Sequence, residues 1–153
     1  MKKYLDLLRV KHYLKNILVS TPIFFNKTLF TERFTTALIG FFSLCLISST
    51  VYILNDIQDA PKDRLHPTKR FRPIADGSIN ILQARVIGGF CLFLSLILSY
   101  LAGGVSGLLL LFIYFVLNVS YSFGLKNQPL IDVIILASGF IIRVIYGAVL
   151  TQI

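Results

Sequence analysis

Long apolar runs separated by short polar stretches dominate the pattern of this chain. Four runs are strong, and a fifth is weaker because Pro22 interrupts it. An α-helix rises about 1.5 Å per residue, so about twenty residues cross a hydrocarbon core of roughly 30 Å. The runs are continuous rather than alternating, which excludes a transmembrane β-barrel. The predicted spans are Leu14–Phe30, which is the weaker one, and Phe34–Leu54, Val86–Ala102, Val105–Tyr121 and Leu130–Leu150.

This pattern predicts an all-α, multi-pass transmembrane helical bundle, with residues 1–153 as a single transmembrane domain. The composition agrees, because 56% of the 153 residues are hydrophobic, which excludes an ordinary soluble domain and a disordered chain. Residues 1–15 mix basic and apolar side chains and predict an amphipathic segment at the membrane surface rather than a cleavable signal peptide. We expect Cys45 and Cys91, which lie inside apolar runs, to be small buried side chains.

Basic residues are distributed unevenly between the predicted loops. The chain has 15 Lys and Arg against seven Asp and Glu, a formal charge of +8. Twelve of the basic residues lie in the N-terminal segment, the loop 55–85 and the turn at Lys126, whereas the opposite side carries only Lys27 and Arg33. Because cytoplasmic loops retain positive charge, we predict a cell-membrane protein whose N-terminus and loop 55–85 are cytoplasmic. The net charge therefore indicates topology, and we expect no nucleic-acid partner.

Acidic residues gather at the start of the long polar loop. Asp56, Asp59 and Asp63 are spaced i, i+3 and i+7, which places three carboxylates on one face of a continuous helix, with Asn55 beside Asp59. Hard oxygen ligands favour Mg²⁺, whose coordination substrate phosphates complete. Pro61 disfavours helix at the residue before it, so we expect Asp63 to lie on a second short turn. The alternative is that these acids only solvate a cytoplasmic loop.

A cationic strip follows the acids in the same loop. Guanidinium and ammonium groups hold phosphate oxygens through charge-assisted hydrogen bonds, so the strip is a candidate phosphate-binding surface. The alternative explanation is the cytoplasmic charge bias alone. We expect His66, which precedes a proline, to be a hydrogen-bonding loop residue rather than a metal ligand. The strip consists of Arg64, His66, Lys69, Arg70 and Arg72.

The acidic run resembles the first aspartate-rich motif of the UbiA superfamily of intramembrane prenyltransferases. It reads Asn55-Asp56-x-x-Asp59-x-x-x-Asp63 and follows a predicted membrane helix. The rest of the loop is similar to the branch of that superfamily that contains decaprenyl-phosphate phosphoribosyltransferase, and the similarity runs along the whole chain. It is carried by Asp63-Arg64-x-His66-Pro67-x-Lys69-Arg70-x-Arg72-Pro73-Ile74-Ala75-x-Gly77, Lys11-His12, Lys15-Asn16, Tyr121-Ser122, Leu125-Lys126, Asp132-Val133, Gly139-Phe140, Arg143 and Gly147.

The resemblance implies roles for the motif residues. Mg²⁺ bridging the diphosphate of a donor would be held by Asn55, Asp56, Asp59 and Asp63. Independently of the resemblance, we expect the cationic strip to bind substrate phosphates.

Two later parts of the chain carry further implied or candidate roles. Tyr121 and Lys126 match a Tyr and Lys pair that holds the donor's phosphates in the family, although five residues separate them here where many members have four. Arg143 is the one basic residue inside a span, and an intramembrane arginine is a functional or interhelical pairing hypothesis by default. Pairing with Asp132 is geometrically weak, because three helical turns separate the two residues.

The resemblance covers only the N-terminal part of a superfamily member. The resemblance implies a bundle of about nine membrane helices with a second aspartate-rich motif, whereas this sequence predicts about five membrane helices. After Lys126 the sequence has Asp132 as its single acid. We therefore expect either a truncated product or a subunit whose missing helices come from a second chain, and we expect the chain alone to be inactive.

Three functions are compatible with these features. The favoured one is Mg²⁺-dependent transfer of 5-phosphoribose from 5-phosphoribose 1-diphosphate to a polyprenyl phosphate, such as decaprenyl phosphate, in the membrane. The second is transfer of a polyprenyl group from its diphosphate to an aromatic acceptor. The third is a non-catalytic truncated paralogue or half-subunit. The stretch from His66-Pro67 to Arg72-Pro73 favours the first.

Overall fold

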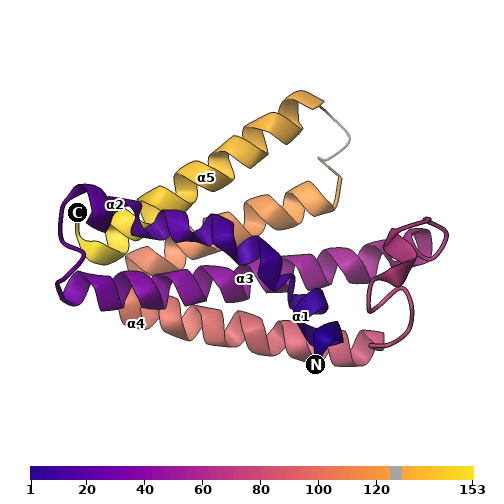
Figure 1. Ribbon diagram of the computed structural model, residues 1–153. Helices are drawn as coiled ribbons and strands as arrows, with labels where there is room; N and C mark the ends of the chain where they lie inside the picture. The colour runs from indigo at the N-terminus through magenta and orange to yellow at the C-terminus, as the bar shows by residue number, and fades with distance from the viewer. Residues whose placement is uncertain (125–128) are drawn as a thin grey trace.

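The computed structural model describes residues 1–124 and 129–153, and helices form all of their regular secondary structure. The elements lie along one another in a membrane-type bundle (Figure 1). Their bounds are α1 Lys2–Leu8, the 3₁₀ helix η1 Val10–Ser20, α2 Thr21–Phe25, α3 Glu32–Asp63, the 3₁₀ helix η2 Lys69–Phe71, α4 Ile81–Ser122 and α5 Pro129–Thr151.

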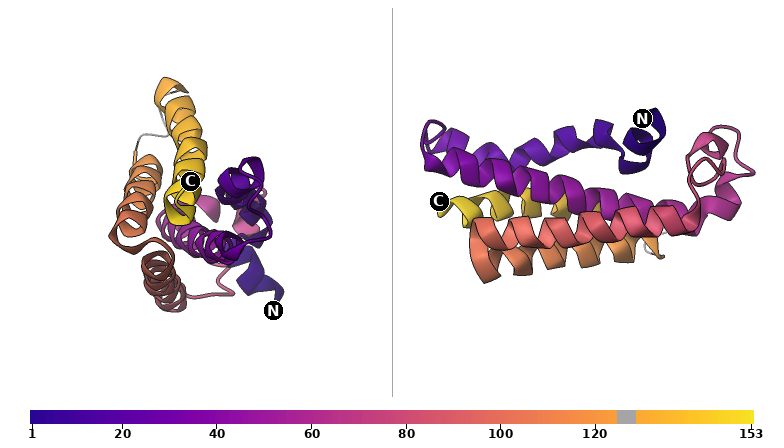
Figure 2. Two further views of the ribbon diagram at one scale, coloured as in Figure 1. Left: turned by 90° about the vertical axis from the view of Figure 1, so that its left-hand side faces the viewer. Right: turned by 90° about the horizontal axis from the view of Figure 1, so that it is seen from below.

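Among the described residues, three helices are long and apolar enough to cross a membrane. They are α3, α4 and the Val133–Thr151 part of α5. In α4 the backbone leaves helical geometry at Gly104, with φ 57° and ψ −143°, a conformation that a residue without Cβ adopts at little cost. The two arms of α4 run back beside each other (Figure 2), which confirms the separate predicted spans on either side of that glycine. The predicted helical membrane bundle is confirmed.

The weaker predicted span, Leu14–Phe30, is not a single long helix. The structure divides this part of the chain between η1 and α2, and Pro22 stands in the first turn of α2, where its missing N–H is tolerated. A 3₁₀ helix rises about 2.0 Å per residue, so η1 and α2 together extend roughly 30 Å. The segment therefore passes along most of the bundle despite its small number of residues.

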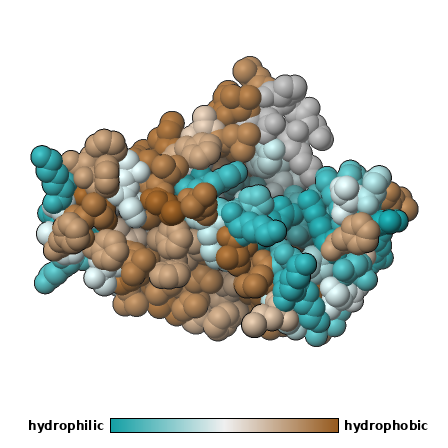
Figure 3. Space-filling view, in the orientation of Figure 1, coloured by the Kyte–Doolittle hydropathy of each residue, from teal (hydrophilic) through white to brown (hydrophobic). Residues whose placement is uncertain are grey.

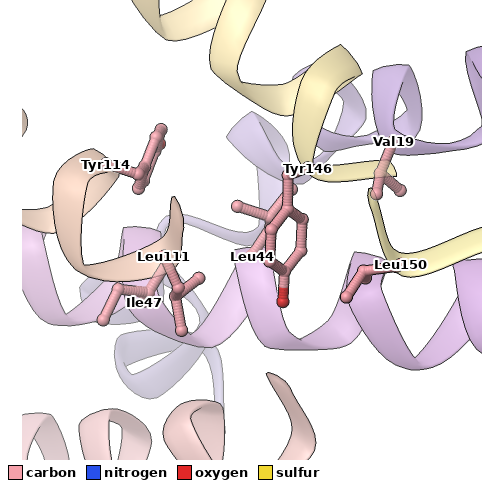
Figure 4. Close-up of a cluster of buried hydrophobic side chains, with 7 residues drawn as sticks. All are labelled: Val19, Leu44, Ile47, Leu111, Tyr114, Tyr146 and Leu150. Atoms are coloured by element: carbon pink, nitrogen blue, oxygen red, sulfur yellow. The ribbon is translucent and has the colours of Figure 1, made fainter. Parts of the chain in front are cut away.

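The main hydrophobic core joins η1, α3, α4 and α5. Figure 4 shows its seven buried side chains, with Tyr146 of α5 between those of the other elements. The Tyr146 hydroxyl is hydrogen-bonded to Ser43 Oγ at 3.2 Å and to Ser99 Oγ at 2.8 Å, so α5, α3 and α4 are also linked by hydrogen bonds. The core members are Val19, Leu44, Ile47, Leu111, Tyr114, Tyr146 and Leu150.

The N-terminus and the long polar loop lie at the same end of the bundle. Lys3 Nζ donates to the Ser78 carbonyl at 3.1 Å, and Leu7 of α1 packs in a second buried cluster with Ile74 and Ile79 of the loop. Hydrophilic side chains gather at this end in Figure 3, while the remaining surface in that view is mostly hydrophobic. The N-terminal segment and the loop 55–85, both predicted to be cytoplasmic, therefore lie together in space. The predicted cytoplasmic turn at Lys126 lies outside the described residues, and the orientation stays a prediction.

The polar loop is shorter than predicted. Its first nine residues belong to α3, which continues through Pro61 to Asp63, so the expectation that Asp63 lies on a separate turn is wrong. Packing overrides the local preference, because Ala60 is buried in the second cluster and its carbonyl accepts from Arg64 N at 3.1 Å. At the other end Asn80 caps α4 by accepting from Gln83 N, so that helix starts ahead of the predicted span.

Candidate functional site

A polar pocket of about 220 Å³ opens between α3, α4, α5 and the N-terminal segment. Figure 1 shows α5 diverging from α3 toward its N-terminal end, and the pocket lies in this wedge. Apolar groups make up most of its wall, and cationic, amide and tyrosine side chains are set among them. The described residues that line it are Arg9, Lys15, Val51, Tyr52, Asn55, Asn118, Tyr121, Ser122, Ile135, Leu136, Gly139, Phe140 and Arg143.

The pocket is electropositive. Arg9, Lys15 and Arg143 line it, and no carboxylate is among its described lining residues. Two asparagine amides and two tyrosine rings add further polar groups. Positive charge of this density in a partly enclosed site favours anions with several oxygens, above all phosphates, because charge-assisted hydrogen bonds are strong there.

The N-terminal segment forms one wall of this pocket. The Arg9 guanidinium lies 4.7 Å from the centre of the Tyr52 ring, and the His12 ring lies 5.6 Å from the same ring. Partial burial, followed by the charges of Arg9 and Lys15, lowers the pKa of His12 below its ordinary value. Of Lys11-His12 and Lys15-Asn16, noted in the sequence only as similarity, Lys15 lines the pocket, and His12 packs against the lining residue Tyr52.

The acidic cluster lies next to the pocket and is already paired with arginines. Asp56 and Asp63 are 2% and 3% exposed. Arg72 donates through one terminal nitrogen to Asp56 Oδ1 at 3.1 Å and to Asp63 Oδ2 at 2.7 Å, and Arg9 also donates to Asp56 Oδ1. Two carboxylates seven residues apart therefore converge on a single cation, as their helical spacing predicts.

Asp59 occupies a different environment from the other two acids. Asn55 Nδ2 donates to Asp59 Oδ2 at 3.2 Å, one helical turn away, and Asn55 lines the polar pocket. Among the described residues, no three His, Cys, Asp or Glu side chains form a group that could hold a metal ion. All four predicted metal ligands, Asn55, Asp56, Asp59 and Asp63, thus lie on one helix. The carboxylates of Asp56 and Asp63 converge on Arg72, whereas that of Asp59 is hydrogen-bonded to Asn55.

Only one residue of the predicted cationic strip reaches the acids. Arg72 does so, whereas Arg64, Lys69 and Arg70 are exposed and are absent from the described lining of the pocket. Arg64 Nε donates to the Ala75 carbonyl at 3.3 Å, a contact within the loop.

His66 has a structural role in the loop. Its Nδ1 accepts from the backbone N–H groups of Thr68 and Lys69 at 3.2 and 3.3 Å. This is the hydrogen-bonding role that we predicted for it. His66 therefore fixes the backbone of the loop that carries the other residues of the cationic strip.

Arg143 is held deep in the pocket. Its side chain reaches from α5 to two other elements, donating through Nε to Asn16 Oδ1 at 2.9 Å and through one terminal nitrogen to the Tyr114 hydroxyl at 2.8 Å. Its guanidinium also lies 5.1 Å from the Tyr114 ring centre and 5.6 Å from that of Phe140. Among the described side chains it has no carboxylate partner within 4.0 Å.

The structure adds residues that the sequence did not single out as site residues. The main ones are Arg9, Asn16 and Asn118. Of the three, the sequence pointed only to Asn16, because it is a polar residue inside a predicted apolar span; in the structure it is 1% exposed. Tyr121 lines the pocket, its phosphate-binding role stays a prediction, and Lys126 lies outside the described residues. Cys45 and Cys91 are buried free thiols, as expected.

Comparisons with known proteins agree with this architecture. Residues 18–153 match the UbiA prenyltransferase family. The chain is 39% identical over 116 residues to decaprenyl-phosphate phosphoribosyltransferase of Mycolicibacterium smegmatis, covering 75% of this chain and 36% of that protein. It is 38% identical over 146 residues to the protein of the same name from Corynebacterium glutamicum, covering 93% of this chain and 44% of that protein.

A solved structure shares the fold. The structure of a digeranylgeranylglyceryl phosphate synthase superposes with a TM-score of 0.79 at 24% identity, covering 97% of this chain and 52% of the other. The chain thus spans less than half the length of the two curated relatives that it matches. Because the family match covers most of its residues, the chain belongs to the UbiA prenyltransferase family.

Proposed function

We propose that this chain forms the donor-binding part of a membrane phosphoribosyltransferase. The donor is 5-phosphoribose 1-diphosphate, and the acceptor is a polyprenyl phosphate in the bilayer. The observation that carries the proposal is the electropositive pocket beside two converging carboxylates, at the polar end of an apolar bundle. The names of the two curated relatives support phosphoribosyl transfer over prenyl transfer.

The pocket supplies the groups that a doubly phosphorylated sugar requires. Arg9 and Lys15 stand at the N-terminal wall, and Tyr121 faces them from α4. The guanidinium and ammonium groups hold phosphate oxygens, while Asn55 and Asn118 offer amides to the sugar hydroxyls. The donor's anomeric carbon is thereby positioned between the polar rim and the apolar interior.

The residues fit the Mg²⁺ that the family implies. Asp56 and Asp63 each place an oxygen within 3.1 Å of one arginine nitrogen, so the two carboxylates are close enough to share a single cation. Mg²⁺ is commonly held by one or two carboxylates together with substrate phosphates. We propose that Asp56 and Asp63 hold it, with Asp59 and Asn55 beside them. When bound, the ion would neutralise charge on the departing diphosphate.

The reaction needs no nucleophilic side chain. An oxygen of the lipid phosphate attacks the anomeric carbon, the bond from that carbon to the diphosphate oxygen breaks, and diphosphate leaves with the electron pair. The chain's own residues contribute by orienting the donor and by fixed positive charge near the leaving group, where Arg9 and Lys15 stand.

We further propose that the chain needs complementary helices to turn over. Its curated relatives are more than twice as long, and they supply the remainder within one polypeptide. In this chain, α5 leaves large apolar side chains exposed along its length, including Leu130, Val133 and Ile141. Further helices that pack on this face in the bilayer would cover it.

The donor assignment is tested by binding and then by transfer. In lipid nanodiscs with Mg²⁺, calorimetric titration should detect 5-phosphoribose 1-diphosphate, and Arg9→Gln should weaken that binding by about tenfold, the effect of losing one charge-assisted contact. Arg85→Gln, at an exposed position outside the pocket, is the matched control. Absence of donor binding by the wild-type chain contradicts the proposal.

The transfer assay uses radiolabelled polyprenyl phosphate. We expect no glycolipid from the chain alone and product after a polypeptide with the missing helices is added. A parallel reaction with a polyprenyl diphosphate and an aromatic acid examines prenyl transfer, and product only in that reaction would replace the proposed donor.

A further inference from the structure

The base of the polar pocket contains a buried cation that the structure has oriented but not neutralised. Arg143 is 9% exposed, and two of its three guanidinium nitrogens donate to neutral groups on η1 and α4. Its other terminal nitrogen lies beside Gly139, where an added Cβ would come within 3.3 Å, so the glycine keeps that edge accessible from the pocket. Within the described residues, no acceptor is hydrogen-bonded to that nitrogen.

This guanidinium lies well below the rim of the pocket. The Tyr114 hydroxyl that accepts from it is also within 3.1 Å of Ser48 Oγ, and Ser48 precedes the rim residue Asn55 by seven positions on α3. At about 1.5 Å per residue, that places the charge roughly 10 Å deeper along the bundle. A cation at such depth is costly unless an anion joins it, because neutral acceptors compensate only part of the lost hydration.

A shallow, open apolar groove lies beside this charge. Its volume is about 490 Å³, and Phe140, which lies 5.6 Å from the guanidinium, lines both the groove and the polar pocket. The groove runs along α5 and touches η1 at Leu18. A ligand that spans the junction would place an anionic end at Arg143 and a hydrocarbon portion in the groove. The groove residues are Leu18, Phe140, Ile141, Val144 and Ile145.

We infer that Arg143 binds the phosphate of the lipid acceptor, with the first isoprenoid units lying in the groove between η1 and α5. This rests on the proposed function and adds the acceptor's place to it. Asn16 and Tyr114 are positioning residues, because their hydrogen bonds fix the plane of the guanidinium and leave its third nitrogen for a phosphate oxygen. The soluble donor meets Arg9 and Lys15 at the rim instead.

Binding to the chain in nanodiscs tests the assignment. Polyprenyl phosphate should bind the wild-type chain, and Arg143→Gln should weaken that binding at least tenfold while affinity for 5-phosphoribose 1-diphosphate changes less than threefold. Unphosphorylated polyprenol should not distinguish the two proteins. Tyr114→Phe keeps the ring and removes the hydroxyl that accepts a hydrogen bond from Arg143. We expect it to lower the affinity for polyprenyl phosphate about threefold and to leave donor affinity unchanged. Arg85→Gln should leave both affinities unchanged.

Photocrosslinking of the wild-type chain gives a second measurement that needs no variant. A polyprenyl phosphate with a diazirine in its first isoprenoid unit should label the peptide containing Phe140 and Val144. Labelling elsewhere, or unchanged lipid-phosphate affinity in Arg143→Gln, overturns the inference. Loss of donor affinity instead of lipid affinity would assign the arginine to the donor. Donor binding is measured separately with Arg9→Gln. A failure of the acceptor assignment can therefore be told apart from a failure of the proposed function.

Discussion

Replacing Arg72 with glutamine removes the cation on which two buried carboxylates converge. In the native chain, one terminal nitrogen of Arg72 contacts both Asp56 and Asp63. Asp56 retains Arg9 after the replacement, whereas Asp63 loses its one ion pair among the described residues. Arg72→Gln should therefore destabilise the polar end of the bundle and create a site with unsatisfied negative charge.

The size of the effect follows from burial. Removing one partner of a fully buried pair costs about 3 to 5 kcal/mol, because a charge remains without compensation. The Asp56 and Asp63 side chains are 3% and 4% exposed, but that of Arg72 is 25% exposed, so water can reach the site when it is gone. We expect a loss of about 2 to 3 kcal/mol, which corresponds to roughly 5 to 10 °C in Tm.

Thermal unfolding in detergent, with and without Mg²⁺, measures this loss and its reversal. Mg²⁺ at ten times its Kd should return about 1.4 kcal/mol to Arg72→Gln, since the ion replaces the missing cation. Arg85→Gln should unfold like the wild type in both conditions. Adding Asp63→Asn to the first variant should restore part of the stability without Mg²⁺. An Arg72→Gln protein as stable as the wild type in the absence of Mg²⁺ would refute the reasoning.

Three other perturbations test the bundle and its orientation. Tyr146→Phe removes two interhelical hydrogen bonds to serines and should lower the unfolding free energy by about 1 kcal/mol, measured by denaturation in detergent. Gly147→Ala would bring a Cβ against the Val19 carbonyl oxygen and should cost about 1 to 3 kcal/mol in the same assay, whereas Gly89→Ala, which faces open space, should be tolerated. Ser78→Cys, in a chain without its native cysteines, should be shielded from an impermeant thiol reagent in intact cells and labelled after permeabilisation; ready labelling in intact cells would invert the predicted topology.

The fold was predictable where one physical requirement dominates. Crossing a bilayer demands about twenty apolar residues in a helix, so the predicted spans correspond closely to α3, α5 and the two arms of α4. Prediction failed where tertiary contacts override local preference. Pro61 stays within α3 because Ala60 and Asp63 are fixed by buried neighbours, and the N-terminal span becomes a 3₁₀ segment packed on α3 and α5.

The candidate site was predictable only in its local part. Helical periodicity alone brings Asp56 and Asp63 to one face, and the structure has them on a shared arginine. The partners that define the pocket are distant in sequence: Arg9 reaches Asp56 across 47 positions, and Asn16 reaches Arg143 across 127. Periodicity within one helix gives no information on pairs so far apart in the sequence. These pairings could therefore be identified only from the three-dimensional structure.

The distribution of charge explains how an acidic motif and an anion pocket can coexist at one end of a bundle. The two buried carboxylates of α3 are turned toward arginines from the N-terminal segment and the loop, so their negative charge is largely compensated before a phosphate approaches. The pocket wall, in contrast, includes Lys15 and Arg143, which form no ion pair among the described side chains. Arg9 belongs to both groups, because it contacts Asp56 and lines the pocket. Its position is therefore set by the acid, which means that Asp56 influences anion binding in a pocket that it does not itself line.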